Sequence, residues 1–223
     1  MTVLVRSVPA ALVVALVMFA VAPWLIHRAP YESTMGLAQK IFYFHVPAGL
    51  TLFLAIFVCG GASLSYLRKG RAASDRLAEA AAEVAVLIGA MVLITGPLWA
   101  RKSWGVWWEW DARITQSLVL WLIFLGYLAL RRFGGPGSER LAAGVAVFGA
   151  VNVPFVYWSV NVWRTLHPKT TVVPSLPVEF GVPFWWSMTA FVAMFVVLVG
   201  LRVRLAEQQD VLDDLLLDAE GRP

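Results

Sequence analysis

The sequence predicts an all-α membrane protein, a single bundle of six transmembrane helices. The chain has 223 residues, of which 60% are hydrophobic and only 14% are charged. A water-soluble domain carries about 25% charged residues, so too little polar surface remains here to cover a soluble globule. Six apolar stretches each approach the roughly 20 residues that a helix needs to cross a bilayer. They span approximately residues 8–26, 46–67, 78–99, 114–130, 141–163 and 184–201.

The first stretch has some features of a signal peptide, because Arg6 precedes its apolar core. Its apolar run is long, however, and the sequence PWLIHRAP that follows contains no clear small-residue cleavage site. We therefore expect a retained helix. The second and third stretches are joined by RKGRAASDR, and the fourth and fifth by RRFGGPGSER. Both links are short and rich in Gly, Ser and charge, which is typical of turns between helices.

Six spans put both termini on the same side of the membrane, and the basic residues indicate which side. One set of connections and ends holds Arg6, Arg68, Lys69, Arg71, Arg76, Arg131, Arg132, Arg140, Arg202, Arg204 and Arg222. The other set holds only Arg28, Lys40, Arg101, Lys102, Arg113, Arg164 and Lys169. Because Lys and Arg accumulate on the cytoplasmic side, we expect both termini there.

The three segments on the outer side are HRAPYESTMGLAQKIFYFH, ARKSWGVWWEWDARIT and WRTLHPKTTVVPSLPVEFGVP. They are longer than the inner links, and they contain all three histidines of the chain: His27, His45 and His167. The sequence therefore predicts that the function resides on this face.

The segment at residues 104–115, WGVWWEWDARIT, concentrates four tryptophans: Trp104, Trp107, Trp108 and Trp110. Tryptophans collect at membrane interfaces, and that explanation suits Trp24, Trp99, Trp158 and Trp163. An interfacial belt of aromatic side chains does not require four tryptophans in one loop, so this explanation is weaker for the cluster. If the segment is helical, Trp104, Trp107 and Trp108 share one face, and Asp111 continues it. Together these side chains would form a flat aromatic shelf with a carboxylate at its edge. Such a shelf would hold a large planar apolar ligand or simply pack against neighbouring loops.

Two acidic residues of this segment have simpler roles open to them. Asp111 could cap the fourth span by accepting backbone N–H bonds near Ile114, or it could pair with Arg113 or Arg101. Glu109 points away from the shelf in the helical arrangement, so we expect it to be exposed to solvent.

The histidines differ in their surroundings. His27 follows the first span beside Arg28, and we expect an interfacial residue there. His45 stands in KIFYFHVPAG at the start of the second span, and His167 stands in TLHPKTT between the last two spans. A lone histidine is more often structural than a ligand, but two on the same face as an aromatic shelf favour haem. Haem iron accepts axial imidazoles, and its propionates attract Arg or Lys. The candidate propionate partners are Arg101, Lys102, Arg113, Arg164, Lys169 and Lys40.

Several classes of function are excluded. The single cysteine, Cys59, lies in an apolar run and cannot form an intrachain disulfide, and there is no C-x-x-C-H or C-x-x-C motif. A structural zinc site would need four ligands, and the single cysteine lies within a predicted span. The chain has no basic arm or RNA-binding motif, so we expect no nucleic-acid partner. It also lacks the phosphate-binding G-x-x-x-x-G-K-[ST] motif.

These residues carry a resemblance. WGVWWEWDARIT resembles the WWD signature, W-G-x-W-W-x-W-D, of the haem-handling proteins of cytochrome c maturation. KIFYFHVPAG at the start of a span, six spans in all, and a histidine in the last outer loop are similar to the CcmC family within that superfamily. The resemblance covers nearly the whole chain.

The resemblance implies a specific site and set of partners. The WWD loop would hold the exposed edge of a non-covalent haem b, with His45 and His167 as axial ligands of the iron. The implied haem-contacting residues of the motif are Trp104, Trp107, Trp108, Trp110, Asp111 and Arg113. The protein would lie in a bacterial inner membrane and deliver haem to the periplasmic chaperone CcmE. Its partners would be the ABC transporter subunits CcmA and CcmB and the small membrane subunit CcmD. No hydrolase or oxidoreductase site is evident, and any catalytic contribution would be promotion of covalent haem attachment to the chaperone.

The end of the chain has two interpretations. We divide the protein into a six-helix domain, residues 1–204, and a cytoplasmic tail, residues 205–223. In the tail, Leu205, Leu212, Leu215 and Leu216 could form a stripe on a short helix opposite its acids. The tail is then either solvated and partly frayed or docked to a transporter subunit.

Two other functions remain open. The first is a permease for haem or a small solute, although the spans contain almost no ionisable residues beyond Glu79 and Glu83 near the cytoplasmic end of the third. The second is an assembly subunit whose Trp loop packs on partners and binds no cofactor.

Overall fold

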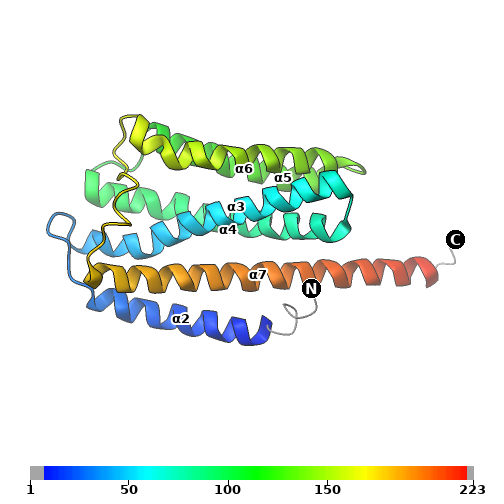
Figure 1. The fold of residues 1–223 in the computed structure, drawn as a ribbon, viewed down its shortest axis with the longest axis horizontal. Coiled ribbons are helices and arrows are strands. Elements are labelled where there is room, and N and C mark those ends of the chain that lie inside the picture. Colours follow the sequence, from blue (N-terminus) through cyan, green and yellow to red (C-terminus); the bar gives the residue numbers. More distant parts are fainter. Residues whose placement is uncertain (1–7, 220–223) are drawn as a thin grey trace.

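The computed structural model describes residues 8–219, which form helices and the connections between them (Figure 1). The elements are α2 (Val8–Arg28), the 3-10 helix η1 (Leu37–Ile41), α3 (Phe42–Lys69), α4 (Ala72–Trp104), α5 (Ala112–Phe133), α6 (Ser138–Val162) and α7 (Val178–Ala219). Within residues 8–219, six helices are long and apolar enough to cross a membrane. The predicted all-α fold with six spans is therefore confirmed. Arg6 and Arg222, which contributed to the predicted orientation, lie outside the described residues.

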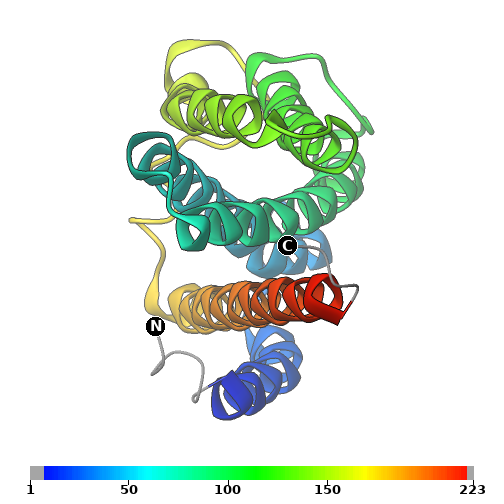
Figure 2. The ribbon, with the colours of Figure 1, turned by 90° about the vertical axis from the view of Figure 1, so that its right-hand side faces the viewer.

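The helices stack in tiers, as the end-on view shows (Figure 2). α7 lies between α2 on one side and the pair α3 and α4 on the other. Beyond that pair, α6 packs on α3, and α5 packs on α4 and α6. A hydrogen bond of 2.9 Å from Nε1 of Trp186 to the backbone oxygen of Met18 joins α7 to α2. The first apolar stretch is thus an integral part of the bundle.

Small residues line the contacts between the central helices. Ala55 of α3 and Ala81 of α4 are fully buried. A Cβ atom at Gly60 of α3 would overlap the side chain of Ala150 on α6. In a bilayer, helices associate through van der Waals packing rather than through the hydrophobic effect, so small side chains that permit close approach stabilise the contact.

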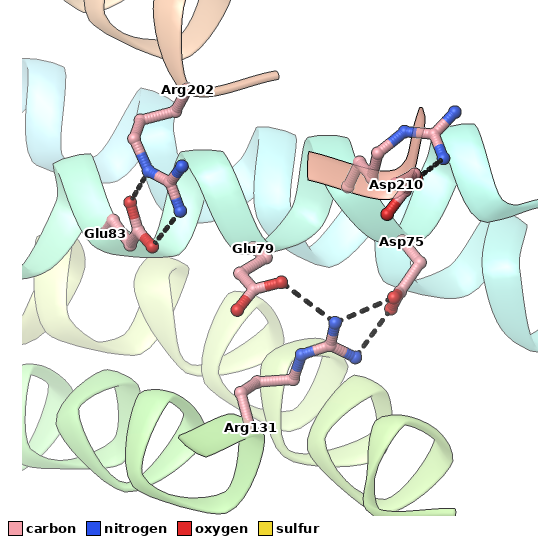
Figure 3. Close-up of polar contacts among 7 residues, drawn as sticks. Asp75, Glu79, Glu83, Arg131, Arg202 and Asp210 are labelled. Atoms are coloured by element: carbon pink, nitrogen blue, oxygen red, sulfur yellow. Dashed lines mark hydrogen bonds and ion pairs between the residues drawn. The ribbon is translucent and has the colours of Figure 1, made fainter. Parts of the chain in front are cut away.

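The two ends of the bundle differ. One end, here called the turn end, has the short links after α3 and α5, where Gly70 adopts a positive φ of 63° and closes α3. Ion pairs join the helices there (Figure 3). Arg131 of α5 pairs with Asp75 at 2.8 Å and with Glu79 at 2.9 Å, and Arg202 of α7 pairs with Glu83. The carboxylates recur every fourth residue of α4, so one face of α4 binds both neighbours.

Helix α7 continues well past the bundle at this end (Figure 1). Its 42 residues give a length of about 63 Å at ~1.5 Å per residue, roughly twice the hydrocarbon thickness of a bilayer. Residues 205–219 belong to the same unbroken helix, and Asp210 pairs with Arg76 of α4 at 2.7 Å. The leucine stripe of the tail is helical and exposed: Leu205, Leu212, Leu215 and Leu216. The division of the chain at residue 204 stays a prediction.

Candidate functional site

The opposite end, here called the loop end, gathers the three long connections at residues 29–41, 105–111 and 163–177 (left in Figure 1). The predicted site residues stand on these connections and on the adjoining helix ends. Their local conformations decide which side chains meet.

The tryptophan segment is not helical. α4 ends at Trp104, because Gly105 takes a left-handed conformation with φ 79°, which ends a helix when glycine follows its last turn. Arg101 donates to the backbone oxygen of Gly105 and closes this end. Residues 105–111 then run as an irregular loop. The predicted helical shelf is therefore wrong, because a left-handed glycine turns the chain after Trp104.

The tryptophans of the loop occupy different environments. Trp104 stacks on Trp99 with ring centroids 6.4 Å apart, and Trp108 is half-buried. Trp107 is 57% exposed and Trp110 is 73% exposed, the latter with its ring against that of Trp108. The interfacial interpretation of Trp99 is also wrong: its side chain is only 4% exposed. The other three tryptophans assigned to the interface are more than half exposed: Trp24, Trp158 and Trp163.

His45 lies in the first turn of α3 and is buried. Its Nδ1 is 2.9 Å from Oγ1 of Thr95 on α4, and the Trp99 ring meets it edge-on at 5.7 Å. Nδ1 therefore has a protein partner, and Nε2 forms no hydrogen bond within the part of the chain that the structure describes.

His167 lies in the irregular connection between α6 and α7. Its Nδ1 is 3.0 Å from the backbone oxygen of Pro168, and a carbonyl can only accept, so Nδ1 carries the proton and Nε2 carries the lone pair. Burial, with the positive charge of Arg113 nearby, lowers the pKa of His167 to about 4. The imidazole is consequently neutral at pH 7, the form that binds a metal.

Asp111 connects the tryptophan loop to the His167 loop. Its Oδ1 accepts from the backbone N–H of Ile114 at 2.8 Å, so the predicted cap of α5 is confirmed. Its Oδ2 accepts from the hydroxyl of Thr165 and from the backbone N–H of Leu166, the latter at 3.2 Å. Thr165 Oγ1 in turn accepts from the backbone N–H of His167 at 3.0 Å. One carboxylate thus fixes both loops relative to α5.

A cavity of about 700 Å³ lies beneath these loops, between α3, α4 and α5. Six of the predicted site residues line it: His45, His167, Trp104, Trp107, Trp108 and Arg113. Trp110 and Asp111 are not part of its lining. Along α4 the lining runs from Trp104 to Gly89, a depth of about 20 Å at ~1.5 Å per residue. The volume lies in the range of small-molecule and cofactor sites, roughly 300–1,000 Å³.

Of the predicted propionate partners, only Arg113 and Lys169 line the cavity. Arg113 donates to the backbone oxygen of Val156 at 2.5 Å, and Lys169 is exposed. Lys40 donates to the backbone oxygens of Ile26 and Ala29 instead. The remaining candidates are exposed and lie outside the lining: Arg101, Lys102 and Arg164. Glu109 is exposed, as predicted, and so is His27.

The cavity lining combines two imidazoles with apolar and aromatic side chains. These are the groups that bind an iron whose four other positions a porphyrin fills. Three buried polar atoms of the lining have no hydrogen-bond partner within residues 8–219: Gln39 Oε1, Trp99 Nε1 and Trp108 Nε1. No group of three or more His, Cys, Asp or Glu that could hold a bare metal ion occurs among the described residues.

The sequence analysis did not assign Thr95, Trp99 or Gln39 to the candidate site. Thr95 and Trp99 lie in the third apolar stretch, where hydropathy alone marks them as part of a span. A Thr-Gly pair one turn before a Trp in that stretch was the available signal.

Comparisons with known proteins agree on one family. The family model described as CcmC, heme exporter protein C, matches residues 1–213. Heme exporter protein C of Bradyrhizobium diazoefficiens is 35% identical over 202 residues, covering 86% of this chain and 76% of the relative. The protein of that description from Escherichia coli K12 is 31% identical over 187 residues, covering 81% and 75%. The one from Paracoccus denitrificans is 31% identical over 206 residues, covering 83% and 86%.

Proposed function

This chain belongs to the CcmC family of haem exporter proteins, and on that premise we propose that it binds haem b in the loop-end cavity. His45 and His167 are the axial ligands of the iron. The observation that carries the proposal is that both histidines line one apolar cavity, each with Nδ1 next to an oxygen atom and Nε2 without a hydrogen-bond partner within residues 8–219. Neutral imidazoles at both axial positions give a low-spin iron.

The remaining lining residues supply the walls and the charges. Trp104, Trp107 and Trp108 offer aromatic surface to the porphyrin. Arg113 and Lys169 are the propionate partners. Trp110 and Asp111 act through their neighbours, since Trp110 packs on Trp108 and Asp111 holds the His167 loop. These are the same Trp and Asp residues that the WWD resemblance implicates.

The loop end faces the periplasm, and the turn end faces the cytoplasm of a bacterial inner membrane. Basic residues of the turn end support this orientation: Arg68, Lys69, Arg71, Arg131, Arg132 and Arg140. The recipient of the haem is the periplasmic chaperone CcmE, and the membrane partners are CcmA, CcmB and CcmD, as the family resemblance implies.

The chain hands haem over without a covalent bond to itself. Its single cysteine, Cys59, is fully buried in α3, far along the helix from His45. The protein's own residues hold the iron, orient the porphyrin edge and exclude water from the cavity. Because His167 stands on a loop, it can move when the chaperone docks.

A permease function finds no support in the ionisable groups of the spans. Glu79 and Glu83 could have marked a polar path, but they pair with Arg131 and Arg202 (Figure 3). Their charges are thereby neutralised at the turn end.

The first test measures haem content and the absorption spectrum of the protein purified in detergent. His45→Ala and His167→Ala should each abolish the low-spin spectrum, and the double variant should retain no haem. His27→Ala is the matched control, because His27 is exposed and outside the cavity. Wild-type haem content and spectrum in the double variant would contradict the proposed site. Absence of haem from the wild-type protein would favour an assembly subunit that binds no cofactor.

The second test concerns transfer. The haem-loaded protein is mixed with apo-chaperone in the absence of the ABC transporter, and covalent haem on the chaperone is measured. We expect an adduct to form. If it forms only with the complete complex, this chain is a passive docking subunit.

A further inference from the structure

Thr95 of α4 fixes the protonation of the His45 ring. Thr95 Oγ1 lies 2.9 Å from Nδ1 of His45 and 2.8 Å from the backbone oxygen of Met91, one turn earlier in α4. The carbonyl of Met91 can only accept, so it takes the hydroxyl proton of Thr95. Oγ1 must then accept from His45, which puts the ring proton on Nδ1 and the lone pair on Nε2. The imidazole is set in the form that binds iron through Nε2.

The same stretch of α4 also fixes the orientation of the ring. A Cβ atom at Gly96 would lie 3.2 Å from Cε1 of His45, so the ring is packed closely against this glycine. The Trp99 ring meets the imidazole edge-on, with an interplanar angle of 69°. His45 itself lies in a helix and is only 8% exposed. Thr95, Gly96 and Trp99 therefore restrain His45 from one rigid element.

His167 has a different kind of support. Its Nδ1 partner is the backbone of the next residue, Pro168, and it belongs to an irregular connection. That connection is attached through Thr165 to the carboxylate of Asp111. Ring and partner move together when the loop moves, whereas the partner of His45 stands on a separate helix.

We infer that Thr95 is a positioning residue for His45, and that it makes His45 the ligand that the iron keeps while His167 is the ligand that leaves during transfer. The inference rests on the proposed haem site. An acceptor on Nδ1–H increases the electron density at Nε2 and fixes the ring, and loss of such a partner typically weakens metal binding by about 10- to 100-fold. A carrier that keeps one ligand and exchanges the other holds its haem until the recipient supplies a replacement.

The first experiment compares Thr95→Val with Thr95→Ser in the full-length protein. Valine has the shape of threonine without the hydroxyl, and serine retains the hydroxyl. Thr95→Val should lower haem retention by about 10-fold or more and shift the reduction potential of the remaining haem to a more positive value, because the imidazole donates less electron density. Thr95→Ser should restore both. The thermal unfolding of each haem-free variant provides the control for a purely structural effect.

The outcomes separate the inference from the proposed function. Absence of haem from the wild-type protein would contradict the proposed function itself. Wild-type retention and potential in Thr95→Val would contradict the inference alone, and so would equal losses in the valine and serine variants. If Thr95→Val does not reach the membrane, Thr95→Ala is compared with Thr95→Ser in the same way.

The second experiment tests which ligand leaves. Haem retention and spectrum are measured for His45→Gly and His167→Gly, each with and without added imidazole. His167→Gly should keep a five-coordinate haem that imidazole converts to the low-spin form, and His45→Gly should lose most of its haem. Greater haem retention in His45→Gly than in His167→Gly would overturn the inference.

Discussion

Asp111 stabilises two loops at once, and its substitution should separate a structural role from a haem-positioning role. Its Oδ1 caps α5 at Ile114, and its Oδ2 accepts from Thr165 and Leu166. A helix cap contributes about 1 kcal/mol, and a hydrogen bond to a charged group about 1.5–3 kcal/mol. Since Asp111 is only half-buried, the low end applies to each bond. The cap and the two link bonds together then stabilise the fold by roughly 4 kcal/mol.

Asp111→Asn should remove part of this contribution selectively. An amide has one acceptor oxygen, so asparagine can cap α5 or hold the His167 loop but cannot do both. We expect a loss of roughly 2–3 kcal/mol from the free energy of unfolding, measured by denaturant titration in detergent. Haem retention should also fall, because Thr165 no longer orients the backbone of His167. Asp111→Ala should show the larger loss of both properties.

Glu109→Gln is the matched control for the charge. It removes the same carboxylate charge two residues away, from an exposed side chain, and should leave unfolding and haem retention unchanged. If Asp111→Asn matches wild type in both measurements, the link between the two loops is not needed. If it loses stability but keeps full haem retention, Asp111 is structural only.

Three further predictions concern other parts of the chain. Trp108→Ala should weaken haem binding by about 2 kcal/mol, since Trp108 lines the cavity, while the amount of protein in the membrane stays unchanged. Trp24→Ala, on the exposed surface of α2, should not weaken it. Equal haem retention in the two variants would refute this. Gly96→Ala should displace the His45 ring and lower haem retention. Gly126→Ala is the control, because a Cβ atom there meets nothing within 4 Å, and it should leave haem retention unaltered. The absorption spectra of the two variants test this difference. Arg131→Met should lower the free energy of unfolding by about 3 kcal/mol, because it leaves two carboxylates at the turn end without their partner. The haem spectrum of the folded fraction should not change. An unaltered unfolding midpoint would count against the ion pairs as a source of stability.

The sequence was sufficient for the properties that depend on short range or on the membrane. Six spans follow from hydropathy, because each helix must satisfy its own backbone hydrogen bonds in lipid. The cap of α5 by Asp111 was predictable because its partner Ile114 is only three residues away. The WWD motif and the two histidines indicated the family and the end of the bundle where the cavity lies.

Local sequence misled where a single residue reverses the chain. The spacing of the tryptophans is helical, but Gly105 adopts φ 79° and ends α4 before the shelf can form. A glycine is compatible with either outcome, since it tolerates both helical and left-handed conformations. The choice depends on what the following loop packs against, and that is not local information.

The tertiary structure alone decided which side chains meet. Thr95 and His45 are 50 residues apart, and Asp111 and Thr165 are 54 residues apart, yet each pair is joined by a hydrogen bond. Trp99 stands near the end of an apolar stretch, where tryptophans are typically interfacial. It is buried instead, because the rotation of α4 about its axis turns it toward α3. In lipid every face of a span is apolar, so hydropathy cannot specify this rotation. It is set by the packing of small residues and by the few polar contacts between helices.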